Sequence, residues 1–199
     1  PEIYLMEGFM DVIAAYRAGI ENAVASMGTA LTSEHVEHLK RFTKKVIVSY
    51  DGDKAGQAAT AKALDELKDL PVQVVQIPDA MDPDEYLQKN SPQDLAYLLT
   101  NTRISPVEFY IHHFRPENSE NLQAQIEFIE KIAPLIAKEP SITAQNSYIH
   151  ILTDHLPSFD YQQVEHIVNE SRVRQRKEKV KETYSPSPIT MSVTKQLTA

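Results

Sequence analysis

The chain has 199 residues and a formal net charge of −8, with 28 acidic residues against 20 basic ones. This length accommodates one domain with a full core or two small domains. The acidic balance argues against a protein that coats nucleic acid by bulk electrostatics. Cysteine is absent, which excludes disulfides and thiolate zinc ligands within the chain and agrees with a cytoplasmic protein. No apolar run approaches the roughly 20 residues needed to cross a bilayer, so we expect no membrane contact.

The first 90 residues alternate between strand and helix patterns. Short apolar runs predict strands at residues 3–6, 23–25, 46–50 and 72–77. Helical spacing predicts helices at residues 9–18, from Thr32 or Ser33 onward, and at 55–68. This alternation implies βαβ units and an α/β fold with a mainly parallel sheet flanked by helices. Because a strand follows Pro1 almost at once, we expect the chain to begin inside a larger domain.

The second predicted helix has an apolar face that we expect to be buried. Val36, Leu39 and Phe42 recur at intervals of three residues along it.

From about residue 91 the strand pattern fades and helical spacing takes over. Apolar residues predict helices around 95–99, 107–114, 120–138, 149–156 and 161–184. Pro134 lies inside the third of these and predicts a kink or a break there. The Ser-Pro repeats after Tyr184 predict a flexible linker. We therefore divide the chain into an α/β part at 1–90, an all-helical subdomain at 91–184 and a linker at 185–199.

Acidic clusters follow three of the predicted strands. Because the carboxyl ends of parallel strands meet at one edge of a sheet, carboxylates there can converge although the chain separates them. Clustered oxygen ligands suit Mg²⁺ or Mn²⁺, which hold and polarise phosphates. The clusters are Glu7 with Asp11, Asp51 with Asp53, and Asp82 with Asp84.

Each cluster also has a simpler interpretation. Asp51-Gly52-Asp53 is compatible with a solvated turn or with a haloacid-dehalogenase-type phosphotransferase, although that family's motif continues to a Thr. A calcium loop is rejected because Lys62 stands where a bidentate Glu is required. Asp11 can favour a helix dipole, and Asp82 can cap a helix that starts at Pro83.

Two further groups of titratable residues stand outside these clusters. The paired histidines, His35 with His38 and His112 with His113, favour surface or packing roles. A cationic run in the last predicted helix is either a solvated helix end or a contact for a phosphate or a partner. It comprises Arg172, Arg174, Arg176, Lys177, Lys179 and Lys181.

Taken together, four ordered segments resemble the Toprim domain of bacterial DnaG-type primases. They are residues 7–14, 25–32, 50–56 and 78–85, which read EGFMDVIA, ASMGTALT, YDGDKAG and PDAMDPDE. The resemblance is specific over residues 1–90. It implies a Toprim-type parallel sheet followed by the helical subdomain that ends the family's RNA polymerase domain. The family's zinc-binding domain and basic subdomain precede this part, and its helicase-interacting domain follows it.

The resemblance also implies a reaction and the residues that carry it. The reaction is the synthesis of short RNA primers from ribonucleoside triphosphates on a single-stranded DNA template, with two or more Mg²⁺ or Mn²⁺ ions and no zinc in this portion. The resemblance assigns metal-ligand or catalytic roles to acidic residues, and it assigns phosphate contacts to a lysine and a turn. The ligands are Asp51, Asp53, Asp84 and Glu7, supported by Asp11 and Asp82, and the phosphate contacts are Lys54, Gly28 and Thr29.

Partners and alternatives follow from the same resemblance. We expect a cytoplasmic monomer at the bacterial replication fork, linked to the replicative helicase through the C-terminal domain of the longer protein, and we expect the 199-residue chain alone to be inactive. Another Toprim enzyme, such as a nuclease or topoisomerase, stays open as an alternative. So does a non-catalytic Toprim module that binds DNA or a partner.

Overall fold

The structure is a computed structural model that describes residues 1–183. The chain divides into two compact units, the first spanning Pro1–His113 and the second starting at Phe114. Each unit has its own core of buried side chains. The linker predicted at residues 185–199 lies outside the described residues.

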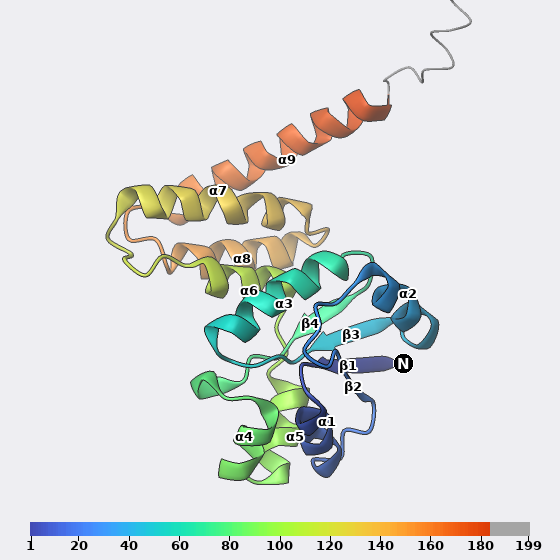
Figure 1. The fold of residues 1–199 in the computed structure, drawn as a ribbon. Helices are drawn as coiled ribbons and strands as arrows, with labels where there is room; N and C mark the ends of the chain where they lie inside the picture. The colour runs from blue at the N-terminus through green and yellow to red at the C-terminus, as the bar shows by residue number, and fades with distance from the viewer. Residues whose placement is uncertain (184–199) are drawn as a thin grey trace, which may run out of the picture. The chain divides into compact units, whose positions relative to one another are not determined.

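A parallel four-stranded sheet forms the centre of the first unit (Figure 1). Its strand order is β2-β1-β3-β4, and all three pairings are parallel. The predicted α/β architecture is therefore confirmed. The strands are β1 (Glu2–Met6), β2 (Ala23–Ala25), β3 (Lys45–Val48) and β4 (Val72–Val74).

The last strand is shorter than predicted. The apolar run at 72–77 continues past the end of β4 at Val74. The Val75 amide still donates to the Val48 carbonyl oxygen at 2.9 Å, and Val75 and Ile77 are buried without being part of the strand. Their burial, rather than strand pairing, accounts for the apolar pattern.

Helices follow the strands and cover both faces of the sheet. Thr32, Asp53, Asp82 and Ser91 cap their helices by accepting backbone N–H groups, as such residues do at helix starts. The elements are α1 (Phe9–Arg17), α2 (Ser33–Phe42), α3 (Lys54–Glu66), the 3₁₀ turn η1 (Pro78–Ala80), α4 (Pro83–Lys89), α5 (Pro92–Asn101) and α6 (Pro106–Phe114).

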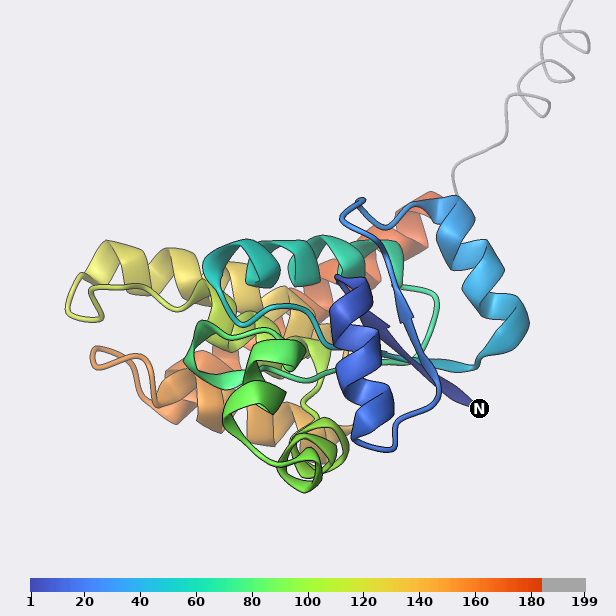
Figure 2. The ribbon, with the colours of Figure 1, turned by 60° about the horizontal axis from the view of Figure 1, so that its bottom comes forward.

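Alternate residues of the central strands face opposite layers, as strand geometry requires. Tyr4, Met6 and Ile47 pack with side chains of α1, α4 and α5, while Leu5 and Val48 pack with those of α2 and α3. Figures 1 and 2 show α1 and α3 on opposite sides of the sheet. Burial of both faces explains why these strands are almost continuously apolar.

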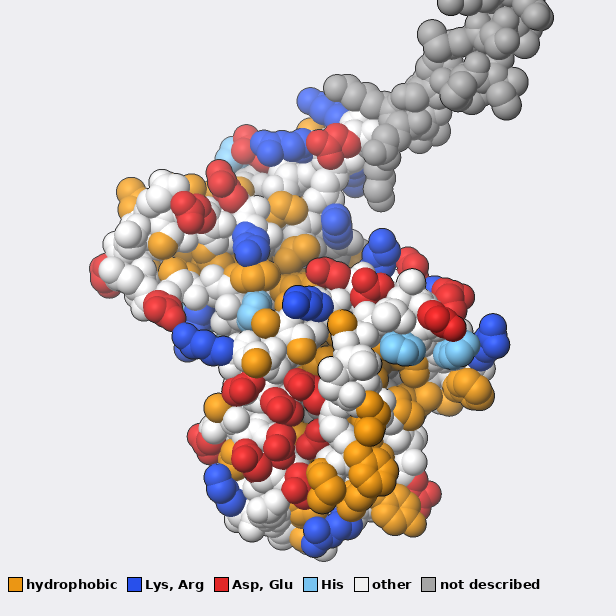
Figure 3. Space-filling view, in the orientation of Figure 1, with side chains coloured by type: hydrophobic (Ala, Val, Ile, Leu, Met, Phe, Trp, Pro, Cys, Tyr) orange, Lys and Arg blue, Asp and Glu red, His pale blue; other side chains and the backbone are white. Residues whose placement is uncertain are grey.

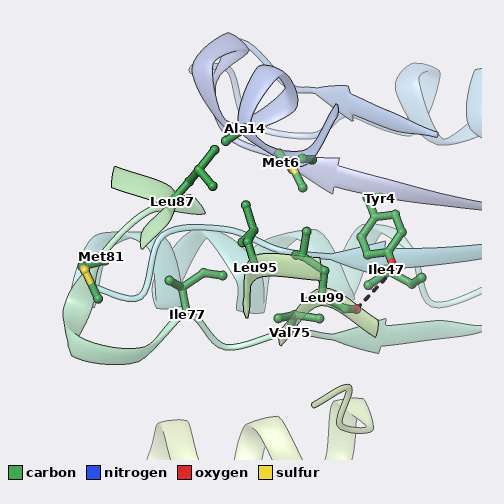
Figure 4. Close-up of a cluster of buried hydrophobic side chains, with 11 residues drawn as sticks. Tyr4, Met6, Ala14, Ile47, Val75, Ile77, Met81, Leu87, Leu95 and Leu99 are labelled. Atoms are coloured by element: carbon green, nitrogen blue, oxygen red, sulfur yellow. Dashed lines mark hydrogen bonds between the residues drawn. The ribbon is translucent and has the colours of Figure 1, made fainter. Parts of the chain in front are cut away.

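Helix α5 is part of the first unit's core although it lies past residue 90. Leu95 and Leu99 are fully buried against the sheet, and the Tyr4 hydroxyl donates to the Leu99 carbonyl oxygen at 3.2 Å (Figure 4). Phe109 of α6 packs on Val74 of β4. The compact unit thus includes helices that follow the acidic motifs in sequence.

The prediction for Phe42 is wrong. Val36 is 3% exposed, but Phe42 is 71% exposed. Six residues along a helix correspond to a rotation of about 240°, so Phe42 lies about 120° from Val36 around the axis. Thr43, just past the end of α2, is buried instead.

Arg103 ties the segment after α5 to the first strand. Its guanidinium forms a bidentate pair with Glu2, at 3.1 Å from Nη1 to Oε2 and 2.9 Å from Nη2 to Oε1, and its Nε donates to the Leu99 carbonyl. It also lies 5.2 Å from the centre of the Tyr4 ring. These hydrogen bonds lower the pKa of Glu2.

We expect Arg103→Ala to lower the free energy of unfolding by about 1–3 kcal/mol, because the change removes the bidentate pair with the partly buried Glu2 carboxylate and one of the donors to the Leu99 carbonyl. Urea unfolding measures this effect. The control is Lys40→Ala, which breaks an exposed pair with Glu37 (2.7 Å) and should change stability by less than about 1 kcal/mol. Equal losses in both variants would contradict a structural role for the Arg103 contacts.

The second unit is helical. It contains α7 (Leu122–Lys138), α8 (Ile142–Thr153) and α9 (Tyr161–Thr183), with Ile129, Ile132, Leu152 and Val168 among its fully buried side chains. Among the helices described in residues 1–183, none is both long and apolar enough to cross a membrane.

Helix α7 runs through Pro134 as one helix, so the predicted break does not occur. A proline removes the N–H that would bond the carbonyl four residues earlier, here that of Glu130. Glu130 is exposed, so water can satisfy this carbonyl and the helix continues.

Candidate active site

The carboxyl ends of the four strands meet at one edge of the sheet, because all the strands run parallel. Glu7 follows β1 directly, Ser26 follows β2, and Asp51 comes three residues after β3. Asp82 arrives at the same edge through the loop after β4, since the Gly52 amide donates to the Met81 carbonyl at 2.9 Å. The fold therefore brings the acidic segments to one edge of the sheet.

The first two acidic segments are in direct contact. The Asp51 amide donates to Glu7 Oε1 at 3.3 Å, and the Gly8 amide donates to Asp11 Oδ2 at 2.8 Å. Asp11 is only 5% exposed although it lies in the first turn of α1. One face of the cluster is thus built by hydrogen bonds that orient the carboxylates from the backbone.

Two other carboxylates are helix caps. Asp53 Oδ1 accepts from the Gly56 amide at 2.7 Å, and Asp82 Oδ1 accepts from the Glu85 amide at 2.6 Å. Capping uses one oxygen of each carboxylate and fixes the position of the other. The capping interpretation of Asp82 is confirmed, and it leaves the carboxylate in the cluster.

Two glycines let the backbone approach the cluster closely. A Cβ on Gly52 would lie 2.2 Å from the Ile77 carbonyl oxygen, and a Cβ on Gly56 would lie 2.2 Å from the Asp51 carbonyl oxygen. Both distances are far inside van der Waals contact and involve backbone atoms. The packing of this segment therefore requires glycine at positions 52 and 56.

The electrostatics show that the carboxylates share one environment. Burial, together with the charges of the neighbouring carboxylates, raises the pKa of Asp51 to about 7; the charges are those of Glu7, Asp11, Asp82 and Asp53. Burial likewise raises the pKa of Asp11 to about 6, against the lowering effect of the Gly8 amide. Like charges gathered in a partly buried place disfavour ionisation. Figure 3 shows Asp and Glu side chains gathered on this face of the first unit.

The other predicted site residues lie near this cluster, but the Asp84 side chain makes a contact of its own. The Asp84 carboxylate accepts from Gln88 Nε2 at 2.8 Å, and it is the Asp84 backbone amide that bonds to Asp11. Lys54 is exposed at the start of α3. Gly28 adopts a φ of 71° in the turn after β2, where the Thr29 hydroxyl donates to the Ser26 carbonyl at 2.6 Å. The structure brings this turn to the same sheet edge.

The donor set fits a cation, although the carboxylates do not converge on a point. Among residues 1–183, no three His, Asp or Glu side chains lie as a ready-made metal site. Asp51 Oδ1, however, is buried and has no hydrogen-bond partner in that part of the chain. A buried oxygen without a donor, surrounded by four like charges, is what a bound cation would stabilise.

We expect Asp51→Asn to stabilise the metal-free chain by about 1 kcal/mol at about pH 8. Because the pKa of Asp51 is raised, the folded state holds its proton more tightly than the unfolded state. Its contribution to stability therefore falls as pH rises from about 4 to about 7, and the variant removes this loss. Thermal unfolding in EDTA measures it.

The control for this prediction is Asp69→Asn, which neutralises an exposed carboxylate. This change should alter stability by less than about 0.5 kcal/mol. A metal-free Asp51→Asn chain that is less stable than the wild type would show that the charge of Asp51 does not destabilise the fold.

Sequence patterns missed a cavity beside Asp51. It has a volume of about 470 Å³ and is lined by Gln57, Thr60, the segment 74–80 and Phe109 as well as by Asp51. Gln57 Nε2 donates to the Gly52 carbonyl at 3.1 Å and so supports the Asp51 loop. The only sequence signal for this cavity is that Gln57 and Thr60 lie on one face of α3, and an ordinary buried helix face has the same spacing.

Comparisons with known proteins agree with this geometry. Residues 4–87 match the protein family described as Toprim-like. A DNA primase of Lactococcus lactis is 56% identical over 168 residues, which are 84% of this chain and 26% of that protein. The chain thus spans about a quarter of the length of this relative.

Solved primase structures share the fold. The RNA polymerase domain of Mycobacterium tuberculosis primase DnaG, in complex with a double-stranded DNA oligomer with a 6-nucleotide overhang, is 29% identical with a TM-score of 0.60, over 78% of this chain and 51% of that one. A DnaG primase catalytic domain bound to ssDNA is 28% identical with a TM-score of 0.58, over 81% and 53%.

Four observations indicate the same family: the ordered acidic motifs, the parallel sheet that brings them together, the Toprim-like match and the primase relatives. The chain belongs to the bacterial DnaG-type DNA primases, of which it forms a segment with a Toprim domain and the helices that follow it.

Proposed function

We propose that this segment supplies the acidic, metal-binding half of a primase active site. In the longer protein it takes part in the synthesis of short RNA primers on single-stranded DNA. The 3′-hydroxyl of the growing strand attacks the α-phosphate of a ribonucleoside triphosphate, and pyrophosphate leaves. The other Toprim enzymes and the non-catalytic module lose support because the 56% identical relative is a DNA primase.

The observation that carries the proposal is the environment of Asp51. Its unpartnered buried oxygen lies among the charges of Glu7, Asp11, Asp53 and Asp82, which is costly for the fold alone. A cation bound by these carboxylates would offset this electrostatic cost.

The carboxylates have different parts in this proposal. Asp51 and Asp53 would hold two or more Mg²⁺ or Mn²⁺ ions, together with Glu7 and, after rotation away from Gln88, Asp84. When bound, the ions supply charge neutralisation of the triphosphate and a lower pKa for the attacking hydroxyl. Glu7 also orients the Asp51 loop through its amide. Asp11 and Asp82 support the cluster with their negative charge.

The phosphate contacts belong to the same edge of the sheet. Lys54 stands at the start of α3, next to Asp53, and the turn at Gly28 and Thr29 ends β2. Cations and turn amides of this kind bind phosphates. We assign them to the triphosphate of the incoming nucleotide.

Partners follow from the family. The proposed template is single-stranded DNA, in line with the DnaG catalytic domain that was solved bound to ssDNA. We further propose a monomer in the bacterial cytoplasm at the replication fork, linked to the replicative helicase through another part of the longer protein.

We expect the 199-residue chain to bind Mn²⁺ but to make no RNA, because its acidic surface lacks the groove of Arg and Lys side chains that must neutralise the template phosphates at the active site. Primer synthesis on single-stranded DNA, compared between this chain and the longer protein, tests the expectation. Synthesis only by the longer protein supports a shared active site. Robust synthesis by the 199-residue chain alone would overturn it, and no synthesis by either would overturn the proposed reaction.

A further inference from the structure

The second unit contains a cavity with basic walls, separate from the acidic cluster of the first unit. Its volume is about 500 Å³, within the range of small-ligand pockets. It lies where α7 ends, α8 begins and α9 passes. The lining includes Lys138, Gln145, Arg172, Gln175 and Arg176.

A buried amide positions the central cation of this cavity. Arg172 Nη2 donates to Gln145 Oε1, and Gln145 Nε2 donates to the Glu139 carbonyl oxygen. Gln145 is only 4% exposed. The partner of Arg172 is a neutral amide and not a carboxylate, so this contact does not offset the positive charge of the guanidinium. Its Nε is buried and has no hydrogen-bond partner among the described residues.

The other cations of the cavity are also unneutralised. Within residues 1–183, the described side chains form no ion pair with Lys138, Arg172 or Arg176. The first turn of α8, capped by Ser141, adds the positive end of a helix dipole. Two features reduce the positive potential of the cavity. One is the C-terminus of α7, which carries the negative end of a helix dipole. The other is the Glu139 carboxylate, which accepts a hydrogen bond from the Ser141 amide at 3.4 Å.

The cavity wall is braced. Gln175 Nε2 donates to the Pro134 carbonyl at 2.9 Å, which joins α9 to α7. Figure 3 shows Lys and Arg side chains along α9, where the sequence left a phosphate contact open as an alternative to a solvated helix end. A guanidinium held in place by Gln145, beside the two further cations Lys138 and Arg176, is suited to a phosphate group.

We propose that this cavity binds a phosphate of a single-stranded nucleic acid, with Arg172 as the positioning cation and Arg176 and Lys138 as further contacts. The site guides the strand and takes no part in the chemistry. It does not depend on the proposed primer synthesis, because binding needs no metal and no reaction.

The test is fluorescence anisotropy of a labelled single-stranded oligonucleotide with the 199-residue chain, in EDTA and at low salt. EDTA keeps the acidic cluster free of cations, so that it repels the strand. We expect Arg172→Gln/Arg176→Gln to weaken binding at least about fivefold and to reduce its salt dependence, since each phosphate contact releases counterions.

Arg174→Gln/Lys177→Gln is the matched control, because it removes two positive charges from the same helix outside the cavity. It should change affinity by less than about twofold. Lys138→Gln/Arg176→Gln leaves the Arg172 contact with Gln145 in place and should also weaken binding, which guards against misfolding of the first variant. Equal losses in the cavity and control variants, or no loss in either cavity variant, would overturn the site.

Competition identifies the source of the phosphate. We expect unlabelled strand to displace the probe, while inorganic phosphate and AMP at equal phosphate concentration do not. Displacement by AMP at that concentration would assign the cavity to a free nucleotide and overturn the strand assignment.

Discussion

Asp51→Asn and Asp53→Asn should each lower primer synthesis by the longer protein about 100-fold to 1,000-fold. Each change removes one anionic ligand and keeps the shape of the side chain, and losses of this size follow when a charge-stabilising group is removed from an active site. Asn caps helices as well as Asp, so the cap that Asp53 provides to α3 is retained. Steady-state primer synthesis with Mg²⁺ and with Mn²⁺ measures the effect.

Asp69→Asn is the control for these two variants. It removes the same charge from an exposed residue that pairs with Lys40. Its activity should stay within about twofold of the wild type. Near-normal synthesis by either site variant would show that the carboxylate is not a ligand.

Gly56→Ala should damage both the fold and the site. The new Cβ would lie 2.2 Å from the Asp51 carbonyl oxygen and 2.7 Å from Asp51 Cβ, so Asp51 has to move. Overpacking of this kind costs about 1–3 kcal/mol, and a displaced Asp51 should also lower the affinity for Mn²⁺ more than tenfold. Urea unfolding and Mn²⁺ titration measure the two effects.

Gly19→Ala separates the two causes. Gly19 has a φ of 85°, and a Cβ added there would meet no atom of a non-neighbouring residue within 4 Å, so alanine encounters backbone strain but no clash. It should cost about 1 kcal/mol and leave Mn²⁺ affinity unchanged. If Gly56→Ala also kept full Mn²⁺ affinity, the close contact with Asp51 would not matter for the site.

Local patterns were enough to predict the architecture of the first unit. Apolar runs buried on both faces identified β1 and β3, and the caps at Thr32 and Asp82 were visible in the sequence. These features depend on neighbouring residues, which a sequence displays directly. The limits of β4 and the exposure of Phe42 depend instead on where pairing ends and how a helix is rotated. Neither is encoded within a few residues.

The sequence predicted which segments meet at the site, but it did not predict how their side chains are oriented. Strand ends in a parallel sheet share one edge, so Glu7 and Asp51 had to meet. The sequence did not reveal that Asp84 turns toward Gln88, or that Asp51 keeps a buried oxygen without a donor. Side-chain orientation depends on packing between distant segments. The same holds for Gln145, whose burial next to Arg172 had no sequence signature.

Calorimetric titration of the 199-residue chain with Mn²⁺ is the most direct measurement of the metal-binding role of the acidic cluster. The wild type should bind Mn²⁺, and the Asp51→Ala/Asp53→Ala double variant should bind at least about 100-fold more weakly, because two ligands and two negative charges are lost together. Circular dichroism would establish that both chains are folded. Equal Mn²⁺ affinity in the wild type and the folded double variant would contradict the assignment of these carboxylates as metal ligands.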